Sequence, residues 1–147
     1  MTTSRRSFLK TPARHILDLI RAASLSSEDV LVDLGSGLGH VPLLVSIQSA
    51  YVACAQESAR NLKLSCVEFM AGDAREADLS TGNVFYLFSP FRGSMLSDML
   101  QRLLRESNKR QIRICSLGPC TRVLQEQLWL KPRTRRNTER VNVFDSQ

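Results

Sequence analysis

The stretch Val30-Leu31-Val32-Asp33-Leu34-Gly35-Ser36-Gly37-Leu38-Gly39-His40 decides how this chain folds. It runs from an apolar strand through an acidic residue to three glycines on alternate positions, and a helix-forming segment follows. Glycines allow positive φ and let the backbone approach a ligand, and the start of a helix offers unpaired N–H groups and a positive dipole end. Ligands of open α/β sheets bind at the carboxyl ends of the strands, where Asp33 is expected. The stretch therefore predicts a binding loop for a nucleotide-type cofactor.

The spacing of the glycines distinguishes between cofactors. A dinucleotide fingerprint, G-x-G-x-x-G, needs its third glycine where this chain has His40, so NAD is disfavoured. The acidic-x-G-x-G-x-G pattern resembles motif I of the class I S-adenosylmethionine-dependent methyltransferases, and its core also resembles that of protein-lysine methyltransferases. A glycine-rich turn without a ligand is the alternative reading. The resemblance implies that the methionine end of S-adenosylmethionine is held by Asp33, Gly35, Ser36, Gly37 and Gly39.

Length and composition predict one domain over residues 1–147, because the chain has 147 residues and is 43% hydrophobic. Within it we expect a flexible basic leader at 1–10 and a basic loop at 131–140 before a terminal strand. Four cysteines without a C-x-x-C pair, beside two histidines, argue against a metal site and a disulfide framework. We expect reduced, packed thiols and no metal.

The chain lacks the ~20 consecutive apolar residues that cross a bilayer, so no membrane partner is expected. Residues 4–10, Ser-Arg-Arg-Ser-Phe-Leu-Lys, match a twin-arginine export signal. The uncharged apolar stretch that such a signal requires does not follow, since Arg14 and Asp18 come next. The sequence therefore predicts a cytoplasmic protein.

Helical and strand patterns alternate along the chain. Thr11 and Pro12 mark a helix start, and we expect the apolar face of that helix to carry Ile16, Leu17, Ile20 and Ala23. Further strands are expected at 30–32, 66–70, 84–88 and 112–117, helices at 40–47 and 94–105, and a terminal hairpin from 129–130 and 141–144. The fold class is α/β, with an open, mostly parallel twisted sheet, helices on both faces and right-handed crossovers. This is the Rossmann-like methyltransferase fold, with one strand of it in question.

Two later turns extend the resemblance. Gly72-Asp73-Ala74 matches the G-D-A that often follows the third strand of class I methyltransferases, which implies that Asp73 and Ala74 bind the adenine. Ser89-Pro90-Phe91 stands where amino-group methyltransferases carry an (Asp/Asn)-Pro-Pro-aromatic motif, so Ser89, Pro90 and Phe91 are acceptor-side candidates. A solvated turn aspartate and a packing aromatic are the alternatives.

The segment from 46 to 64 is too short for the second strand and second helix of the family. If residues 51–62 form a strand, Glu57 lies about 20 residues beyond the glycine loop, where a ribose-binding acid belongs. If they form a helix, which their alanine content favours, the ribose acid is missing. We prefer the helix, which predicts weak cofactor binding.

The formal net charge of +6 permits a nucleic-acid partner, because basic residues gather near both ends. The basic residues near the carboxyl end of the sequence are Lys131, Arg133, Arg135, Arg136 and Arg140. The sequence as a whole predicts an S-adenosylmethionine-dependent methyltransferase acting on an unidentified protein, nucleic acid or small molecule, with no assigned oligomeric state. The alternatives are a non-catalytic methyltransferase-like partner subunit and a basic nucleic-acid-binding domain.

Overall fold

The computed structural model describes residues 13–26, 28–34, 74–88, 92–137 and 139–147. In chain order the elements are α1 (Ala13–Ala22), β1 (Leu31–Leu34), the short 3-10 helix η2 (Ala74–Glu76), β2 (Val84–Phe88), α3 (Gly93–Ser107), β3 (Arg113–Leu117), α4 (Cys120–Gln125), β4 (Leu130–Pro132) and β5 (Asn142–Ser146). The expected strand at 66–70 and helix at 40–47 lie outside the described residues, as do Thr11, Pro12 and the segment 46–64.

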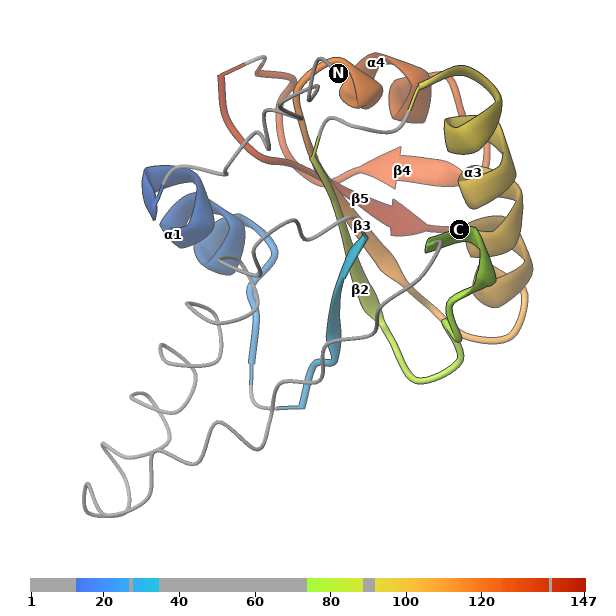
Figure 1. Cartoon of the computed structure of the whole chain (residues 1–147). Coiled ribbons are helices and arrows are strands. Elements are labelled where there is room, and N and C mark those ends of the chain that lie inside the picture. Colours follow the sequence, from blue (N-terminus) through green and yellow to red (C-terminus); the bar gives the residue numbers. More distant parts are fainter. Residues whose placement is uncertain (1–12, 27, 35–73, 89–91, 138) are drawn as a thin grey trace, which may run out of the picture.

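The described strands form one five-stranded sheet in the order β1-β2-β3-β5-β4. β1, β2 and β3 are parallel, whereas β5 is antiparallel to both of its neighbours, β3 and β4. The predicted terminal hairpin is confirmed, because β4 and β5 pair directly. The fold is therefore α/β with a mixed sheet, parallel over its first three strands (Figure 1).

Helices cover both faces of this sheet, as predicted (Figure 1). Successive side chains of a strand point to opposite faces, so β2 buries Phe85 and Leu87 against α3 and α4, and Val84 and Tyr86 against α1. Because both of its faces are buried, β2 is a continuous apolar and aromatic run, as a central parallel strand must be.

The helix expected at 94–105 is confirmed as α3. Leu96, Met99, Leu100 and Leu103 are buried, at the spacing of a helix stripe. The prediction for α1 is wrong in one position, because Leu17 is 46% exposed and Leu19 is fully buried instead. The helix is rotated so that Ile16, Leu19 and Ala23 face the sheet, a spacing of three and four residues that fits a helix equally well.

Candidate functional site

The three parallel strands end at a common edge of the sheet, here called the carboxyl edge. Leu34, the last residue of β1, pairs with Leu87, and Phe88 at the end of β2 pairs with Leu117 at the end of β3. Adjacent strands lie about 4.8 Å apart. The chain therefore leaves β1 toward the glycine segment and β2 toward the Ser89 segment from neighbouring points, although those two segments are far apart in sequence.

Several predicted site residues lie outside the described residues, and their predicted roles stay predictions. They are Gly35, Ser36, Gly37, Gly39, Glu57, Asp73, Ser89, Pro90 and Phe91. Asp33 and Ala74 are described, and each shows how the fold supports the segment beside it.

Asp33 lies inside β1, one residue before the strand ends. Strand alternation directs its side chain to the face of Leu31, which is the face that α1 covers. Burial raises the pKa of Asp33 from 3.8 to about 7, and among the described residues no hydrogen bond or positive charge offsets that burial. A carboxyl group in this state favours a bound cation or hydrogen-bond donor, because either one stabilises its ionised form.

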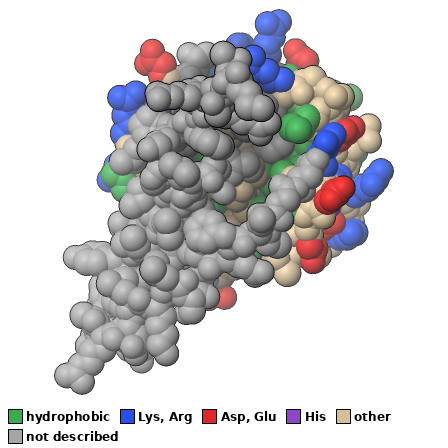
Figure 2. Space-filling model, in the orientation of Figure 1, with side chains coloured by type: hydrophobic (Ala, Val, Ile, Leu, Met, Phe, Trp, Pro, Cys, Tyr) green, Lys and Arg blue, Asp and Glu red, His purple; other side chains and the backbone are tan. Residues whose placement is uncertain are grey.

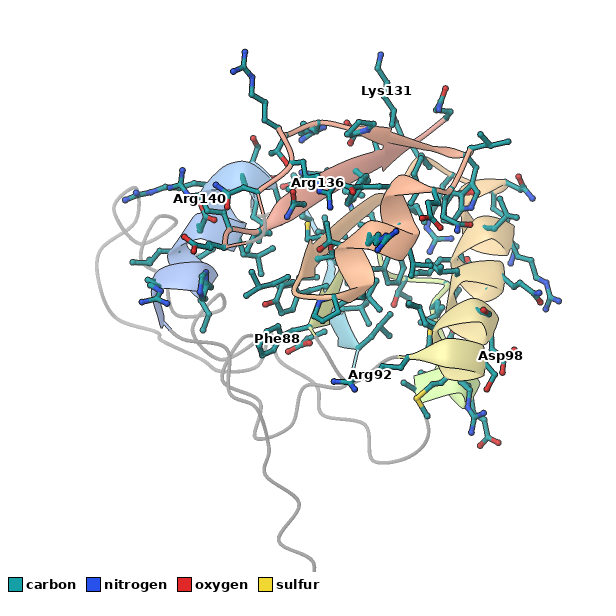
Figure 3. All side chains as sticks on the ribbon, turned by 90° about the horizontal axis from the view of Figure 1, so that it is seen from above. Phe88, Arg92, Asp98, Lys131, Arg136 and Arg140 are labelled. Atoms are coloured by element: carbon teal, nitrogen blue, oxygen red, sulfur yellow. The ribbon has the colours of Figure 1, made fainter. Side chains whose placement is uncertain are left out.

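Aromatic side chains lie beside Asp33. Tyr86 pairs with it across the strands and is fully buried, and Phe88 follows two residues later on the same sheet face. Phe88 is only half-buried, and Figure 3, which looks onto the carboxyl edge, shows its ring there. The sequence predicts only that Phe88 ends a strand, and the alternation along β2 places it on the face of Asp33. It is an added candidate for apolar contact with a ligand.

Ala74 is the first residue of η2, and α3 anchors this short helix. The guanidinium of Arg102 donates to the backbone oxygen of Ala74 at 3.1 Å, and also to the backbone oxygens of Arg75 and Ala77. These bonds fix the position of η2, which directly follows Gly72 and Asp73 in the sequence. No sequence signal could have identified Arg102, because an arginine on a helix resembles a solvated residue and its acceptors are backbone carbonyls 25 to 28 positions away.

Residues 133–141 connect β4 to β5 and also lie at the carboxyl edge. Pro132 pairs with Phe144 and Asn142 pairs with Ser116, so β4 ends and β5 begins near the end of β3. In Figure 3, which looks onto the carboxyl edge, Arg136 and Arg140 lie together near α1. Phe88 and Arg92 lie in a different part of the same view.

The opposite, amino edge has a structural role. Asp29 there accepts hydrogen bonds from Ser26 N at 2.9 Å and from Asn83 Nδ2 at 2.8 Å, and pairs with Arg113. Burial raises the pKa of Asp29, but these hydrogen bonds and the charge of Arg113 outweigh burial and hold the pKa below its usual 3.8. Arg113 also donates to the backbone oxygen of Ala23, so the network joins α1, β1 and β3.

In the described part of the chain, no three His, Cys, Asp or Glu side chains are grouped to hold a metal ion. None of its helices is long and apolar enough to cross a membrane. Cys115 and Cys120 are buried and form no disulfide within the described residues, as predicted for packed thiols, and burial raises the pKa of Cys115 to about 12. Cys54 and Cys66 lie outside the described residues.

Comparison with known proteins agrees with this architecture. No protein-family model matches the chain, and no curated protein matches it. Among solved structures, the chain is similar to an RNA methyltransferase from Salinibacter ruber, crystallised in complex with S-adenosyl-L-homocysteine. The TM-score is 0.64 at 21% identity, and the match covers 94% of this chain and 92% of that one. The chain therefore shares the α/β fold of that protein.

Proposed function

We propose that this chain is a single-domain, class I S-adenosylmethionine-dependent methyltransferase. The observation that carries the proposal is the carboxyl group of Asp33, half-buried at the carboxyl edge directly before the glycine segment. S-adenosylmethionine carries a positive ammonium and a positive sulfonium. A cation bound near Asp33 would favour its ionised form, and so recover the free energy that burial of the carboxylate costs.

The fold supports the same cofactor. The similar Salinibacter ruber protein is an RNA methyltransferase with S-adenosyl-L-homocysteine bound, and its fold extends over nearly the whole of this chain. The pattern Asp33-x-Gly35-x-Gly37-x-Gly39 gives the backbone freedom that close approach to such a ligand requires. In this proposal Asp73 and Ala74 bind the adenine, and Arg102 keeps them in position through η2.

Bound S-adenosylmethionine supplies a methyl group already activated by its attachment to a sulfonium. The protein has to position the acceptor in line with that methyl group and to exclude water, and orientation alone lowers such barriers by several kcal/mol. Ser89, Pro90 and Phe91 are the acceptor-side candidates, because they follow β2 at the edge where β1 ends. Phe88, half-buried beside them in sequence, would shield that side of the site from solvent.

The test is the shift in melting temperature that S-adenosyl-L-homocysteine causes in four proteins. We expect S-adenosyl-L-homocysteine to raise the melting temperature of the parent chain and of the control Glu28→Gln. This control removes an exposed carboxylate that lies before the amino end of β1. We expect little or no shift for Asp33→Asn and none for Gly37→Val, whose side chain would occupy the volume of the methionine end. Equal shifts in all four folded proteins would refute the site assignment.

A further inference from the structure

We propose that the β4–β5 loop, residues 133–141, binds the phosphate backbone of a nucleic acid through Arg135 and Arg136. If the proposed function holds, this nucleic acid is the methyl acceptor, because the loop and the proposed cofactor site share the carboxyl edge.

The first argument is the charge of the loop. Between 133 and 140 it carries four arginines and a single acidic residue, Glu139. Two of the arginines are paired: Arg133 with Asp145 at 2.9 Å and Arg140 with Asp18 at 3.6 Å. The other two, Arg135 and Arg136, are exposed, and they form no hydrogen bond or ion pair within the described part of the chain.

The second argument is that the loop backbone is held in place. The amide of Asn142, 2% exposed, accepts from Asn137 N at 3.1 Å and donates to the backbone oxygens of Asn137 and Arg140 at 2.7 and 2.9 Å. Thr134 Oγ1 accepts from Val143 N at 3.0 Å. A loop fixed in this way presents its free guanidinium groups at defined positions, which lowers the entropy lost on binding.

A third contact ties the loop to α1. Asp18 accepts from Val141 N at 3.0 Å through one carboxylate oxygen and pairs with Arg140 through the other. The loop is therefore anchored at both of its ends, while Arg135 and Arg136 between them form no ion pair or hydrogen bond with the described part of the chain. Figure 2 shows basic side chains, with acidic ones among them, projecting from the upper edge of the molecule, where the parallel strands end.

The chemistry of the loop favours nucleic acid over a membrane surface. Residues 133–140 include no apolar side chain that could enter a bilayer, and they combine arginine with threonine and asparagine. Guanidinium groups bind phosphate oxygens through two parallel hydrogen bonds, and hydroxyl and amide groups also contact the phosphates and sugars of nucleic acids. We therefore expect the loop to bind nucleic acid and not a membrane surface.

The experiment measures binding of the full chain to a fluorescein-labelled 20-nucleotide single-stranded RNA by anisotropy, from low to moderate salt. The loop variant is Arg135→Gln/Arg136→Gln. Its control is Arg21→Gln/Arg105→Gln, which removes the same charge from exposed positions at the end of α1 and in the last turn of α3, near the amino edge. Circular dichroism confirms that each variant is folded.

We expect the loop variant to lose roughly tenfold in affinity at low salt, and the slope of log K against log salt to fall by about 1.4, at about 0.7 per lost phosphate contact on a single strand. The control should lose much less. The proposal is overturned if the parent binds neither this RNA nor single-stranded DNA of the same sequence at low salt, or if both variants lose affinity equally, which would indicate diffuse charge attraction. It is also overturned if the loop variant loses affinity only for phosphatidylserine vesicles.

The two experiments test the basic loop and the cofactor site separately. If S-adenosyl-L-homocysteine binds the parent but the loop variant keeps its RNA affinity, the loop assignment is wrong and the cofactor assignment stands. If the ligand does not bind while RNA binding depends on the loop, the chain is a nucleic-acid-binding domain and the methyltransferase proposal is wrong. The loop variant should keep the ligand-induced shift in melting temperature, because neither arginine belongs to the proposed cofactor site.

Discussion

Replacing Asp33 by asparagine should stabilise the ligand-free protein at neutral pH. The pKa of this carboxyl group rises from 3.8 in the unfolded chain to about 7 in the fold because of burial. A folded pKa above the unfolded one means that the folded state holds the proton more tightly, so stability falls as pH rises through this interval. Asparagine keeps nearly the same shape but has no charge to bury.

The magnitude follows from linkage at about 1.36 kcal/mol per pKa unit. Ionisation of Asp33 should cost the parent up to about 4 kcal/mol in total, most of it above pH 5. Urea unfolding of the parent and of Asp33→Asn at pH 5 and pH 8 measures the effect directly. We expect the stability advantage of the variant to be about 2 to 3 kcal/mol larger at pH 8 than at pH 5.

A difference between the two proteins that does not change with pH would refute the reasoning, because it would show that the carboxyl group is not held in an unfavourable environment. The same substitution should lower the affinity for the cofactor although it raises the stability of the fold. The stabilised variant should bind S-adenosyl-L-homocysteine more weakly than the parent, since an amide does not attract an ammonium as a carboxylate does. Gain of stability with loss of binding at the same residue is typical of functional positions.

Four further substitutions test the framework around the site. Gly82→Ala should destabilise the fold by about 1–3 kcal/mol in urea titration, because a Cβ at residue 82 would stand only 2.6 Å from Cγ2 of Val32, a residue of β1. Asp29→Ala should cost about 1–3 kcal/mol by the same method, since it removes the ion pair with the half-buried Arg113 and the acceptor of the Asn83 amide, and the parent should lose this contribution as pH falls below 4. Arg102→Gln should weaken S-adenosyl-L-homocysteine binding in calorimetry more than the control Arg105→Gln, because Arg102 donates hydrogen bonds to the backbone of η2 and Arg105 is exposed. Glu57→Gln should leave that affinity nearly unchanged if residues 51–62 are helical, and a large loss would instead support the ribose-binding strand.

The sequence was informative wherever a local pattern determines the structure. The strand at 84–88 and the helix at 93–107 could be predicted because burial on two faces or on one stripe leaves a period that can be read directly. The short helix α1 was ambiguous, since Ile16, Leu17, Leu19, Ile20 and Ala23 surround more than one face, and only packing on the sheet selects Leu19 over Leu17.

Long-range polar contacts could not be predicted from the sequence. Arg102 and Arg113 bond to backbone oxygens, which every residue carries, so their partners leave no signature in the sequence. The position of the basic loop was also not apparent, because the sequence shows its charge but not the edge of the sheet at which it lies. The antiparallel insertion of β5 between β3 and β4 places the loop at the carboxyl edge.

The central claim, that the glycine segment after β1 binds S-adenosylmethionine, is tested most directly by isothermal titration calorimetry of the full chain. The account predicts saturable binding of both S-adenosylmethionine and S-adenosyl-L-homocysteine with one molecule per chain, and no binding of NAD. With residues 51–62 helical, the dissociation constant should lie above tens of micromolar, or about 6 kcal/mol of binding free energy. No binding of either sulfur ligand up to about 1 mM, a limit of about 4 kcal/mol, would contradict the account.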